Sequence, residues 1–353
     1  MKAYALYGVD DLRMEERDIP QPGPGQVLVR VGAAGICGSD IPRIFKTGTY
    51  SFPTVPGHEF SGTVTEVGNG TAPEWKGRRV GIFPLIPCRQ CASCRQKRYE
   101  LCRNYSYLGS RTDGGFAEYV LVPQECLIAL PESIDFETAA MLEPMAVAIH
   151  AMRRAQVSQE KTVAVYGQGA IGLLLTMFLK EAGIKQVLAI GNKKQQKDLA
   201  TAMGVAEEDF CDTRTRQLES WLMEKTDGTG VDVFFECIGK SDTISAAIDM
   251  TAPMGTVQLV GNPYGNVDLD KAVYWKILRN QLTVKGCWNS SFIPESTDDW
   301  HYAIERLAGG RIHPERLITH KFPLERLPQG LAIMRDKTEE YVKIIIDFEC
   351  HIL

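Results

Sequence analysis

The segment "KTVAVYGQGAIGLLLTMFLKEAG", residues 161–183, constrains the fold more than any other part of the sequence. An apolar run typical of a buried strand leads into G-x-G-x-x-G, and an apolar stretch of helical length follows. Glycines at this spacing permit a tight turn and bring backbone amides close to a pyrophosphate at a helix N-terminus. The segment therefore predicts a dinucleotide-binding turn, with the coenzyme next to Gly167, Gly169, Ala170, Ile171 and Gly172.

Further strand-like segments follow this turn at "QVLAIGN", "VDVFFECIG", "TVQLVGN" and "LTVKGCW". They predict a doubly wound parallel sheet in residues 149–286, with Val260 at the coenzyme. Short strands punctuated by Gly and Pro precede it, and the strand-like "YVKIIIDFEC" comes after it. We expect residues 1–148 and 287–353 to form one partly barrel-like β domain, giving an α/β protein of two domains.

The composition restricts the class of partner. A net charge of -5 argues against a nucleic-acid footprint, which needs clustered Lys and Arg. No run reaches the roughly 18 apolar residues of a membrane helix, and the N-terminal segment lacks the apolar stretch of a signal peptide. We expect a cytoplasmic protein with a small-molecule partner, in which clustered cysteines bind metal and do not form disulfides.

Four cysteines form C-x2-C-x2-C-x7-C within "PCRQCASCRQKRYELC", inside a predicted lobe of residues 84–108. Four thiolates this close can surround one tetrahedral Zn²⁺, and a closed set leaves no position for a substrate. The spacing predicts a structural zinc ion on Cys88, Cys91, Cys94 and Cys102.

A second set of potential ligands is mixed in chemistry. Cys37 in "GICGSD" and His58 and Glu59 in "PGHEF" combine with Glu143 in "LEPMA". A lone Cys or His is more commonly structural, so the hypothesis depends on their combination beside a coenzyme domain. Sulfur, nitrogen and oxygen ligands with an open position describe a catalytic zinc, which polarises an alcohol oxygen and lowers its pKa. Two zinc ions per chain are therefore expected.

With these motifs in place, the sequence resembles the zinc-dependent medium-chain dehydrogenase/reductase family over its full length. "GICGSD", "GHEFSG", the four-cysteine lobe, "GGFAEY", "EPMAVAIHA" and "GQGAIG" occur in the family's order. The resemblance implies a GroES-like catalytic domain and a Rossmann domain. As in the family's polyol branch, it implies a catalytic zinc on Cys37, His58 and Glu143, with Glu59 binding directly or through water and Ser39 relaying the alcohol proton.

Within the family, "GICGSDIPRIFKTGTYSFPTVPGHEFSG", "LGSRTDGGFAEY" and "KILRNQLTVKGCW" resemble the galactitol-1-phosphate 5-dehydrogenases. The resemblance implies hydride transfer from a secondary alcohol of a polyol phosphate, of the galactitol 1-phosphate to tagatose 6-phosphate type. The substrate phosphate then needs cations, for which Arg43, Lys46 and Arg111 are candidates. A homodimer or homotetramer is also implied, with strands pairing across the edge of the dinucleotide-binding sheet.

The segment "VLAIGNKK", residues 187–194, bears on the choice of coenzyme. NAD sites carry a carboxylate about 20 residues beyond the glycines, where it binds the ribose hydroxyls. Gly191 stands at that place and makes room for a 2′-phosphate, for which Asn192, Lys193 and Lys194 supply donors. Lysines opening a helix are also unfavourable unless an anion lies nearby. We expect NADP to be favoured, with NAD possible if the lysines are only solvated.

Three alternatives remain open from the sequence. One is a zinc dehydrogenase of an unphosphorylated polyol, and another is a dehydrogenase of a pentitol phosphate. The third, from a different class, is a cofactor-binding protein without turnover, because a fold does not by itself establish catalysis. The presence of both catalytic ligands and the relay serine argues against this third alternative.

Overall fold

The computed structural model describes residues 1–294 and 297–349 and divides into two units. One unit holds Met1–Glu143 and the chain from Ser291 onward, and the other holds Pro144–Ser290. Among the described helices, none is long and apolar enough to cross a membrane. The two units are taken separately below.

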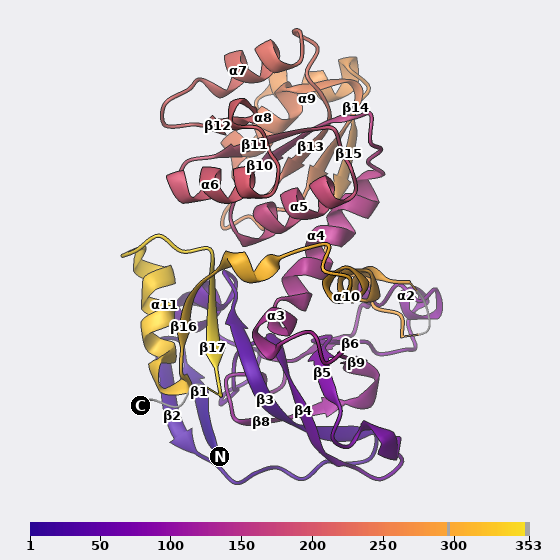
Figure 1. Ribbon diagram of the computed structural model, residues 1–353, viewed down its shortest axis with the longest axis vertical. Helices are drawn as coiled ribbons and strands as arrows, with labels where there is room; N and C mark the ends of the chain where they lie inside the picture. The colour runs from indigo at the N-terminus through magenta and orange to yellow at the C-terminus, as the bar shows by residue number, and fades with distance from the viewer. Residues whose placement is uncertain (295–296, 350–353) are drawn as a thin grey trace. The chain divides into compact units, whose positions relative to one another are not determined.

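The unit Pro144–Ser290 contains a six-stranded parallel sheet with the strand order β12-β11-β10-β13-β14-β15, which confirms the predicted doubly wound sheet. Strands and helices alternate along the chain: α4 (Leu142–Ala155), β10 (Thr162–Tyr166), α5 (Ala170–Glu181), β11 (Gln186–Gly191), α6 (Lys194–Ala202), β12 (Phe210–Asp212), α7 (Leu218–Lys225), β13 (Val231–Glu236), α8 (Ser241–Asp249), β14 (Thr251–Leu259), α9 (Lys271–Arg279) and β15 (Thr283–Gly286). Figure 1 shows α5 and α6 on one face of this sheet and α8 and α9 on the other. Covered on both faces, the central strands can be apolar almost throughout, as the burial of Val163–Val165 shows.

The other unit is built on a seven-stranded sheet, in which β3 pairs with β4, β8 and β17. Its strands and longer helices are β1 (Lys2–Gly8), β2 (Asp11–Glu16), β3 (Gln26–Ile36), β4 (Glu59–Val67), β5 (Arg79–Ile82), β6 (Leu85–Ile86), β7 (Ser106–Tyr107), β8 (Tyr119–Pro123), β9 (Leu127–Ala129), α3 (Phe136–Ala140), α10 (Asp299–Ala308), β16 (Ile318–Phe322), α11 (Leu327–Asp336) and β17 (Lys343–Asp347). Strand β17 lies antiparallel to β3, with Ile344 opposite Ile36. The end of the chain therefore lies beside the strand that leads to Cys37.

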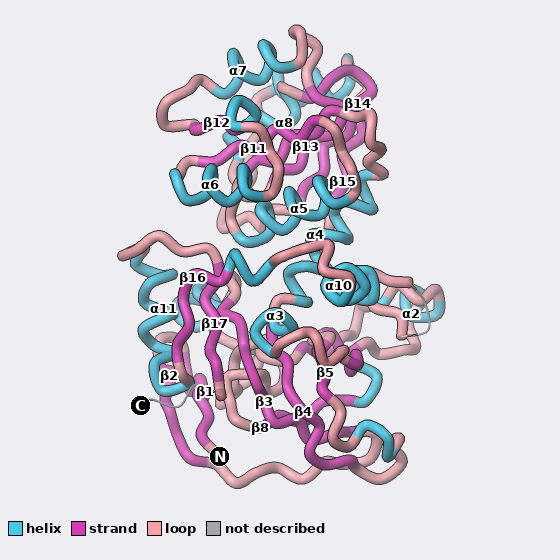
Figure 2. Tube along the Cα trace, viewed as in Figure 1, coloured by secondary structure: helices cyan, strands magenta, loops and turns pink. Residues whose placement is uncertain are grey.

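Residues 84–108 consist mostly of loops, which Figure 2 draws around the short helix α2 (Ala92–Arg95). The two-residue strands β6 and β7 pair at the base of this lobe, with Leu85 opposite Tyr107. Only Cys94, Glu100 and Cys102 are buried between Cys88 and Cys102. So small an apolar core indicates that hydrophobic packing alone does not stabilise the lobe and that it needs a crosslink such as a bound metal ion.

Candidate functional site

Three of the predicted zinc ligands meet where strands of the first unit end and begin. Cys37 follows β3, His58 precedes β4 and Glu59 is the first residue of β4, opposite Gly35 of β3. One ligand atom from each of the three lies within 4.8 Å of the others. His58 and Glu59 are buried and Cys37 is half-buried. The antiparallel pairing of β3 with β4 thus brings together side chains about twenty residues apart in sequence.

Asp40 stands behind Cys37 and His58. It is fully buried, and its Oδ2 accepts a hydrogen bond of 2.9 Å from the Cys37 backbone N–H. Its Oδ1 lies 3.3 Å from His58 Nδ1, which is buried and makes no hydrogen bond of good geometry. Burial lowers the pKa of His58, but the charges of Asp40 and Cys37 raise it by more, so that the pKa is well above its ordinary value. A carboxylate in this position orients the imidazole of a metal-binding histidine.

Glu59 is paired with a residue from the far end of the chain. Its Oε2 accepts a hydrogen bond from Lys343 Nζ, and both side chains are 2% exposed. The same Nζ donates to the backbone oxygen of Ile36 at 3.1 Å. Burial lowers the pKa of Lys343, but Glu59 and Cys37 more than offset this and keep it above its ordinary value. Lys343 therefore holds the Glu59 side chain in one orientation next to Cys37.

Glu143 lies near this group but has a different partner. Its Oε1 accepts a hydrogen bond of 3.2 Å from the Tyr107 hydroxyl, and its ligand atoms fall outside the cluster of Cys37, His58 and Glu59. Burial raises the pKa of Glu143 to about 7. The Tyr107 ring centroid lies 5.7 Å from that of His58. Glu143 thus faces the same group of side chains from helix α4.

Ser39 was expected to relay a proton, or else to cap a turn. It occupies the N-cap of the short helix α1 (Asp40–Pro42), but its side chain makes no capping hydrogen bond. Its hydroxyl instead lies 3.3 Å from Cys37 Sγ and is oriented to donate to it. The serine hydroxyl is therefore directed to the predicted metal ligands.

The chemistry of this donor set fits a zinc ion. A thiolate, an imidazole and a carboxylate are the three classes of protein ligand that zinc prefers. Asp40 and Glu59 each have a cationic partner, Arg43 and Lys343, so both carboxylates are held in place around the cluster. The set is also small enough to leave a position open for an oxygen of a substrate.

The four cysteines of the lobe also come together. Their sulfur atoms all lie within 4.8 Å of one another, and Cys91 Sγ is 3.5 Å from Cys94 Sγ. All four are free thiols. Backbone N–H groups of Arg103 and Cys94 lower the pKa of Cys91 to about 6, whereas burial raises the pKa of Cys94 to about 12. One preformed thiolate beside three further sulfurs is a set that a zinc ion would complete.

The glycine turn of the second unit has the form expected for a phosphate site. Gly167 has a φ of 99°, a conformation that favours glycine. A side chain at Gly172 would collide with the Gly167 carbonyl, 1.9 Å from the Cβ position, whereas the Cβ position of Gly169 has no heavy atom within 4 Å. Gly169 is the N-cap of α5, and no described side chain caps this helix. Its first amides remain available to an anion.

The residues expected to choose the coenzyme lie at the carboxyl end of β11. Gly191 is buried, and a Cβ there would lie 2.6 Å from Gln196 Oε1 and 2.9 Å from Phe210 Cζ. A side chain at position 191 would therefore collide with these two residues, whereas glycine fits. Gln196 Oε1 accepts from the Asn192 N–H at 2.9 Å.

Two lysines and one valine are the remaining residues that the sequence places at the coenzyme. Lys194 pairs with Asp198 at 2.6 Å on the exposed surface of α6, while Lys193 is the N-cap of the helix. Val260 follows β14, where its N–H donates to the Glu236 backbone oxygen at 2.8 Å. All these residues lie at carboxyl ends of parallel strands, the edge at which such sheets bind ligands.

The three candidate phosphate-binding cations differ in their surroundings. Arg43 donates to Asp40 at 3.0 Å and is therefore already paired. Lys46 is exposed. Arg111 is half-buried, with its guanidinium carbon 4.0 Å from the ring centroid of Tyr50 and 4.5 Å from that of Tyr105. Of the three, Arg111 alone is both partly desolvated and held in place by rings.

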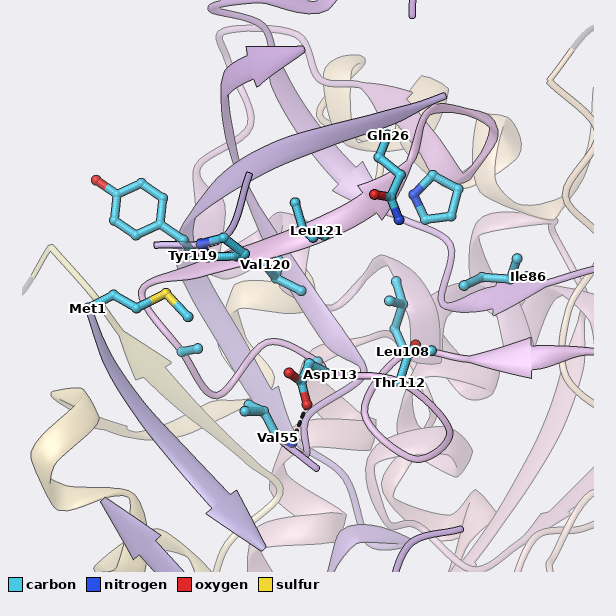
Figure 3. A pocket seen from close by; sticks show the side chains of 14 residues that line it. Met1, Gln26, Val55, Ile86, Leu108, Thr112, Asp113, Tyr119, Val120 and Leu121 are labelled. Carbon is cyan, nitrogen blue, oxygen red and sulfur yellow. Dashed lines mark hydrogen bonds between the residues drawn. The ribbon is translucent and has the colours of Figure 1, made fainter. Parts of the chain in front are cut away.

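A pocket of about 250 Å³ in the same unit lies beside the strand β8 (Figure 3). Its walls are mainly apolar and include Met1, Leu108 and Val120. Asp113 also lines it, and its Oδ1 accepts from the Val55 N–H at 2.8 Å, the dashed line in Figure 3. None of the predicted zinc ligands lines this pocket, so it does not contribute to the metal centre.

The sequence interpretation missed three residues of the centre. Asp40 could have been predicted, because it ends the "GICGSD" motif. A carboxylate three residues after Cys37 can accept a hydrogen bond from the Cys37 backbone N–H. Tyr107 and Lys343 gave no local signal. Lys343 is separated from Glu59 by 284 residues, and only the pairing of β17 with β3 brings it there.

Family comparisons agree with this architecture. Residues 23–132 match the family described as "Alcohol dehydrogenase GroES-like domain", and residues 170–309 match "Zinc-binding dehydrogenase". Galactitol 1-phosphate 5-dehydrogenase of Escherichia coli (strain K12) is 34% identical over 322 residues, which cover 91% of this chain and 92% of that protein. The crystal structure of galactitol-1-phosphate dehydrogenase from Escherichia coli superposes with a TM-score of 0.91 at 32% identity, covering 98% of this chain and 100% of that chain.

Two further relatives broaden the comparison. D-arabitol-phosphate dehydrogenase of Enterococcus avium is 33% identical over 347 residues, covering 96% of this chain and 95% of that protein. A zinc-binding dehydrogenase from Sinorhizobium meliloti 1021, crystallised with NADP, has a TM-score of 0.88 and 30% identity, and the match covers 98% of each chain.

Proposed function

The chain belongs to the zinc-containing medium-chain alcohol dehydrogenase family and is an NAD(P)-dependent polyol dehydrogenase, and from this premise we propose that it oxidises a secondary alcohol of a polyol phosphate. The proposed reaction is of the galactitol 1-phosphate to tagatose 6-phosphate type. The observation that carries the proposal is the meeting of Cys37, His58 and Glu59 within 4.8 Å in a chain that also has the glycine turn.

In the proposed mechanism, Cys37, His58 and Glu59 would hold the catalytic zinc, and Glu143 is a further candidate ligand. The bound zinc polarises the alcohol oxygen and stabilises negative charge that develops on it. Asp40 fixes the imidazole of His58, and Lys343 fixes Glu59. The Ser39 hydroxyl would accept the alcohol proton and pass its own proton on to solvent, and a bound nicotinamide would supply the hydride acceptor.

In the second unit, we assign the coenzyme pyrophosphate to the amides at the N-terminus of α5, over Gly169. Ala170 and Ile171 supply the first of these amides, and Val260 lies at the same edge of the sheet. The cysteine lobe holds a structural zinc with no access for substrate. The catalytic role belongs to the first unit and the dinucleotide-binding role to the second.

The preference for a phosphorylated substrate is supported by two independent observations. Both curated relatives named above act, by their names, on polyol phosphates. The first unit also contains Arg111, a half-buried cation next to aromatic rings on the loop that follows Tyr107. An unphosphorylated polyol is the second candidate, because sorbitol dehydrogenase relatives are about as similar, at 30% identity.

We propose that NADP is favoured over NAD. Gly191 supplies no carboxylate to repel a 2′-phosphate, and Gln196 and Phe210 occupy the place such a carboxylate would need. Lys193 is the N-cap of α6 and Lys194 is its first residue, so both cations stand next to Gly191 and Asn192. Backbone amides at the start of α6 add donors.

We also propose a homo-oligomer, a dimer or tetramer, formed through β15. This strand is the edge of the parallel sheet in the part of the chain described, and Val284 on it is 42% exposed. Exposed apolar side chains flank it, namely Tyr274, Trp275, Leu278 and Trp288. An open edge beside such residues favours pairing with a second copy.

Replacing His58 by alanine tests the assignment of the catalytic centre. We expect loss of turnover, one zinc ion per chain in place of two by elemental analysis, and little change in the circular dichroism spectrum. Unchanged activity would sink the assignment. A wild-type protein with one zinc ion and no turnover would favour a cofactor-binding protein.

The substrate and coenzyme are tested together by kcat/KM for galactitol 1-phosphate, galactitol and D-arabitol 1-phosphate, each with NAD and NADP. A large advantage of the phosphate esters with NADP is the expected result. Turnover of galactitol alone would support the zinc centre but contradict the proposal that the substrate carries a phosphate. A preference for NAD would show that the residues after β11 do not bind a 2′-phosphate.

A further inference from the structure

We propose that Arg111, clamped between Tyr50 and Tyr105, is the residue that binds the phosphate of the substrate and thereby sets the preference for phosphorylated polyols. The inference rests on the proposed function, in which the substrate carries a phosphate. It goes further, because it selects one of the three candidate cations and assigns to Tyr50 and Tyr105 the role of orienting it.

The clamp covers the guanidinium of Arg111 with aromatic rings. Its central carbon lies 4.0 Å from the ring centroid of Tyr50 and 4.5 Å from that of Tyr105. Cation–π contacts at these distances hold a guanidinium plane in one orientation without using its N–H groups. The four N–H groups on the two terminal nitrogens of Arg111 are left for an oxygen ligand.

The donors of Arg111 lack acceptors among residues 1–294 and 297–349. Its Nε is buried and makes no hydrogen bond, and no carboxylate lies within ion-pair distance of its guanidinium. Two other arginines of this unit that stack on rings do have oxygen partners. Arg13 stacks on Tyr7 and donates twice to Asp11, and Arg79 stacks on Phe136 and donates to the Ile134 carbonyl.

A buried, unsatisfied guanidinium donor is costly, so a functional explanation is called for. A phosphate monoester supplies oxygens that can accept two parallel N–H bonds from one arginine, and such charge-assisted pairs are strong. A neutral hydroxyl can accept only one and brings no charge. The chemistry of the site therefore favours a phosphate.

The loop that carries Arg111 is tied to the metal centre. The Tyr107 carbonyl accepts hydrogen bonds from the Arg111 N–H at 2.9 Å and from the Thr112 N–H at 3.2 Å. The side chain of the same Tyr107 donates to Glu143 and lies beside His58. Tyr105 contacts Tyr107 edge to face, at 6.3 Å between centroids. The distance from the clamp to the predicted zinc ligands is thus fixed by one short, hydrogen-bonded segment.

The test compares Arg111→Met with Arg13→Met, a matched control that also removes a ring-stacked arginine from the same unit. With zinc-loaded protein, Arg111→Met should lower kcat/KM for galactitol 1-phosphate by about 100-fold, mainly through KM. It should leave kcat/KM for galactitol within about threefold of wild type. Tyr105→Phe should keep the preference for the phosphate, and Tyr105→Leu should weaken it.

Inorganic phosphate gives a second measurement that needs no turnover. It should raise the melting temperature of wild type and Arg13→Met, but not that of Arg111→Met. Equal losses for both substrates in Arg111→Met, or an equal phosphate shift in all three proteins, would overturn the proposal. If galactitol 1-phosphate is not a substrate of the wild-type protein, the proposed function is wrong about this substrate. The change in melting temperature with inorganic phosphate still decides whether Arg111 binds the anion.

Discussion

Two buried charged side chains, Asp40 and Lys343, stand behind the proposed zinc ligands without belonging to them. Each is tied to a ligand and to backbone: Asp40 to the Cys37 N–H, and Lys343 to Glu59 and the Ile36 carbonyl. Such partners restrict the rotamers of metal-binding side chains before the metal arrives. At the scale of single residues, the centre is therefore preorganised by charges that never touch the substrate.

We expect Lys343→Met to be strongly destabilising. The substitution leaves Glu59 buried without its counter-charge, and breaking a buried pair from one side costs about 3–5 kcal/mol. Urea unfolding followed by tryptophan fluorescence measures the loss. The double variant Lys343→Met with Glu59→Gln should recover a large part of the stability, because it removes both charges. A loss in the double variant as large as in the single one would show that the packing of the lysine stem matters more than the pair.

At this scale, the sequence could predict ligands but not their supports. The sequence motifs contain residue types that bind metals, namely Cys37, His58 and Glu59. The structure brings these three side chains together. Lys343 lies in an apolar strand, where a lysine looks like the solvent-facing position of an alternating pattern. Its burial follows from the register of β17 against β3, a contact between distant parts of the chain.

At the scale of elements, the cysteine lobe depends on its metal. Between Cys88 and Cys102 it has one short helix and few buried side chains, so bound zinc supplies much of its folding free energy. We expect Cys94→Ser to lose the structural zinc and to speed amide hydrogen exchange in residues 88–103, with the strands β10 and β13 unchanged. Protection that persists in the lobe without zinc would contradict this.

The N-terminus of α10 should be sensitive to pH. Asp298 caps this helix by accepting from the N–H groups of Trp300 and His301, and it also lies 3.0 Å from His301 Nδ1. The hydrogen bond to Asp298 raises the pKa of His301. The resulting stabilisation is complete below the histidine pKa of the unfolded chain and is lost as the pH rises through the higher pKa of the folded state.

His301→Gln should therefore lower the melting temperature more at about pH 5.5 than at about pH 8.5, on either side of the ordinary histidine pKa. The control is His313→Gln, since His313 lies on the exposed surface beside Glu315. An equal loss at both pH values would show that His301 contributes through its stacking on Phe292 and not through charge.

Five of the six strands of the parallel sheet could be predicted because each has a strong local pattern, whereas the three-residue strand β12 was not predicted. The strands β10 and β11 are apolar and flanked by glycine turns, and α5 follows its glycines directly. The strand β17 was also predicted from its pattern. The pairing of β3 with three other strands could not be predicted, since any of several registers would bury an apolar face.

At the scale of the whole molecule, the proposed oligomer depends on the sheet edge at β15. Val284→Asp puts a charge on the edge strand that the proposed contact would bury. We expect light scattering to give a smaller mass for this variant than for wild type. Met14→Asp, a change of an equally exposed residue on β2, should leave the mass unaltered. If both variants keep the wild-type mass, the contact lies elsewhere.

The crowding around Gly191 has a consequence for how the choice of coenzyme can evolve. A carboxylate introduced there alone would collide with Gln196 and Phe210 before it could meet a ribose, so Gly191→Asp should impair the protein with either coenzyme. Gln196→Ala removes only one of these two contacts, so a carboxylate at position 191 also needs Phe210 to move or to be replaced by a smaller residue. A change of coenzyme at this position therefore depends on the neighbouring side chains and not on residue 191 alone.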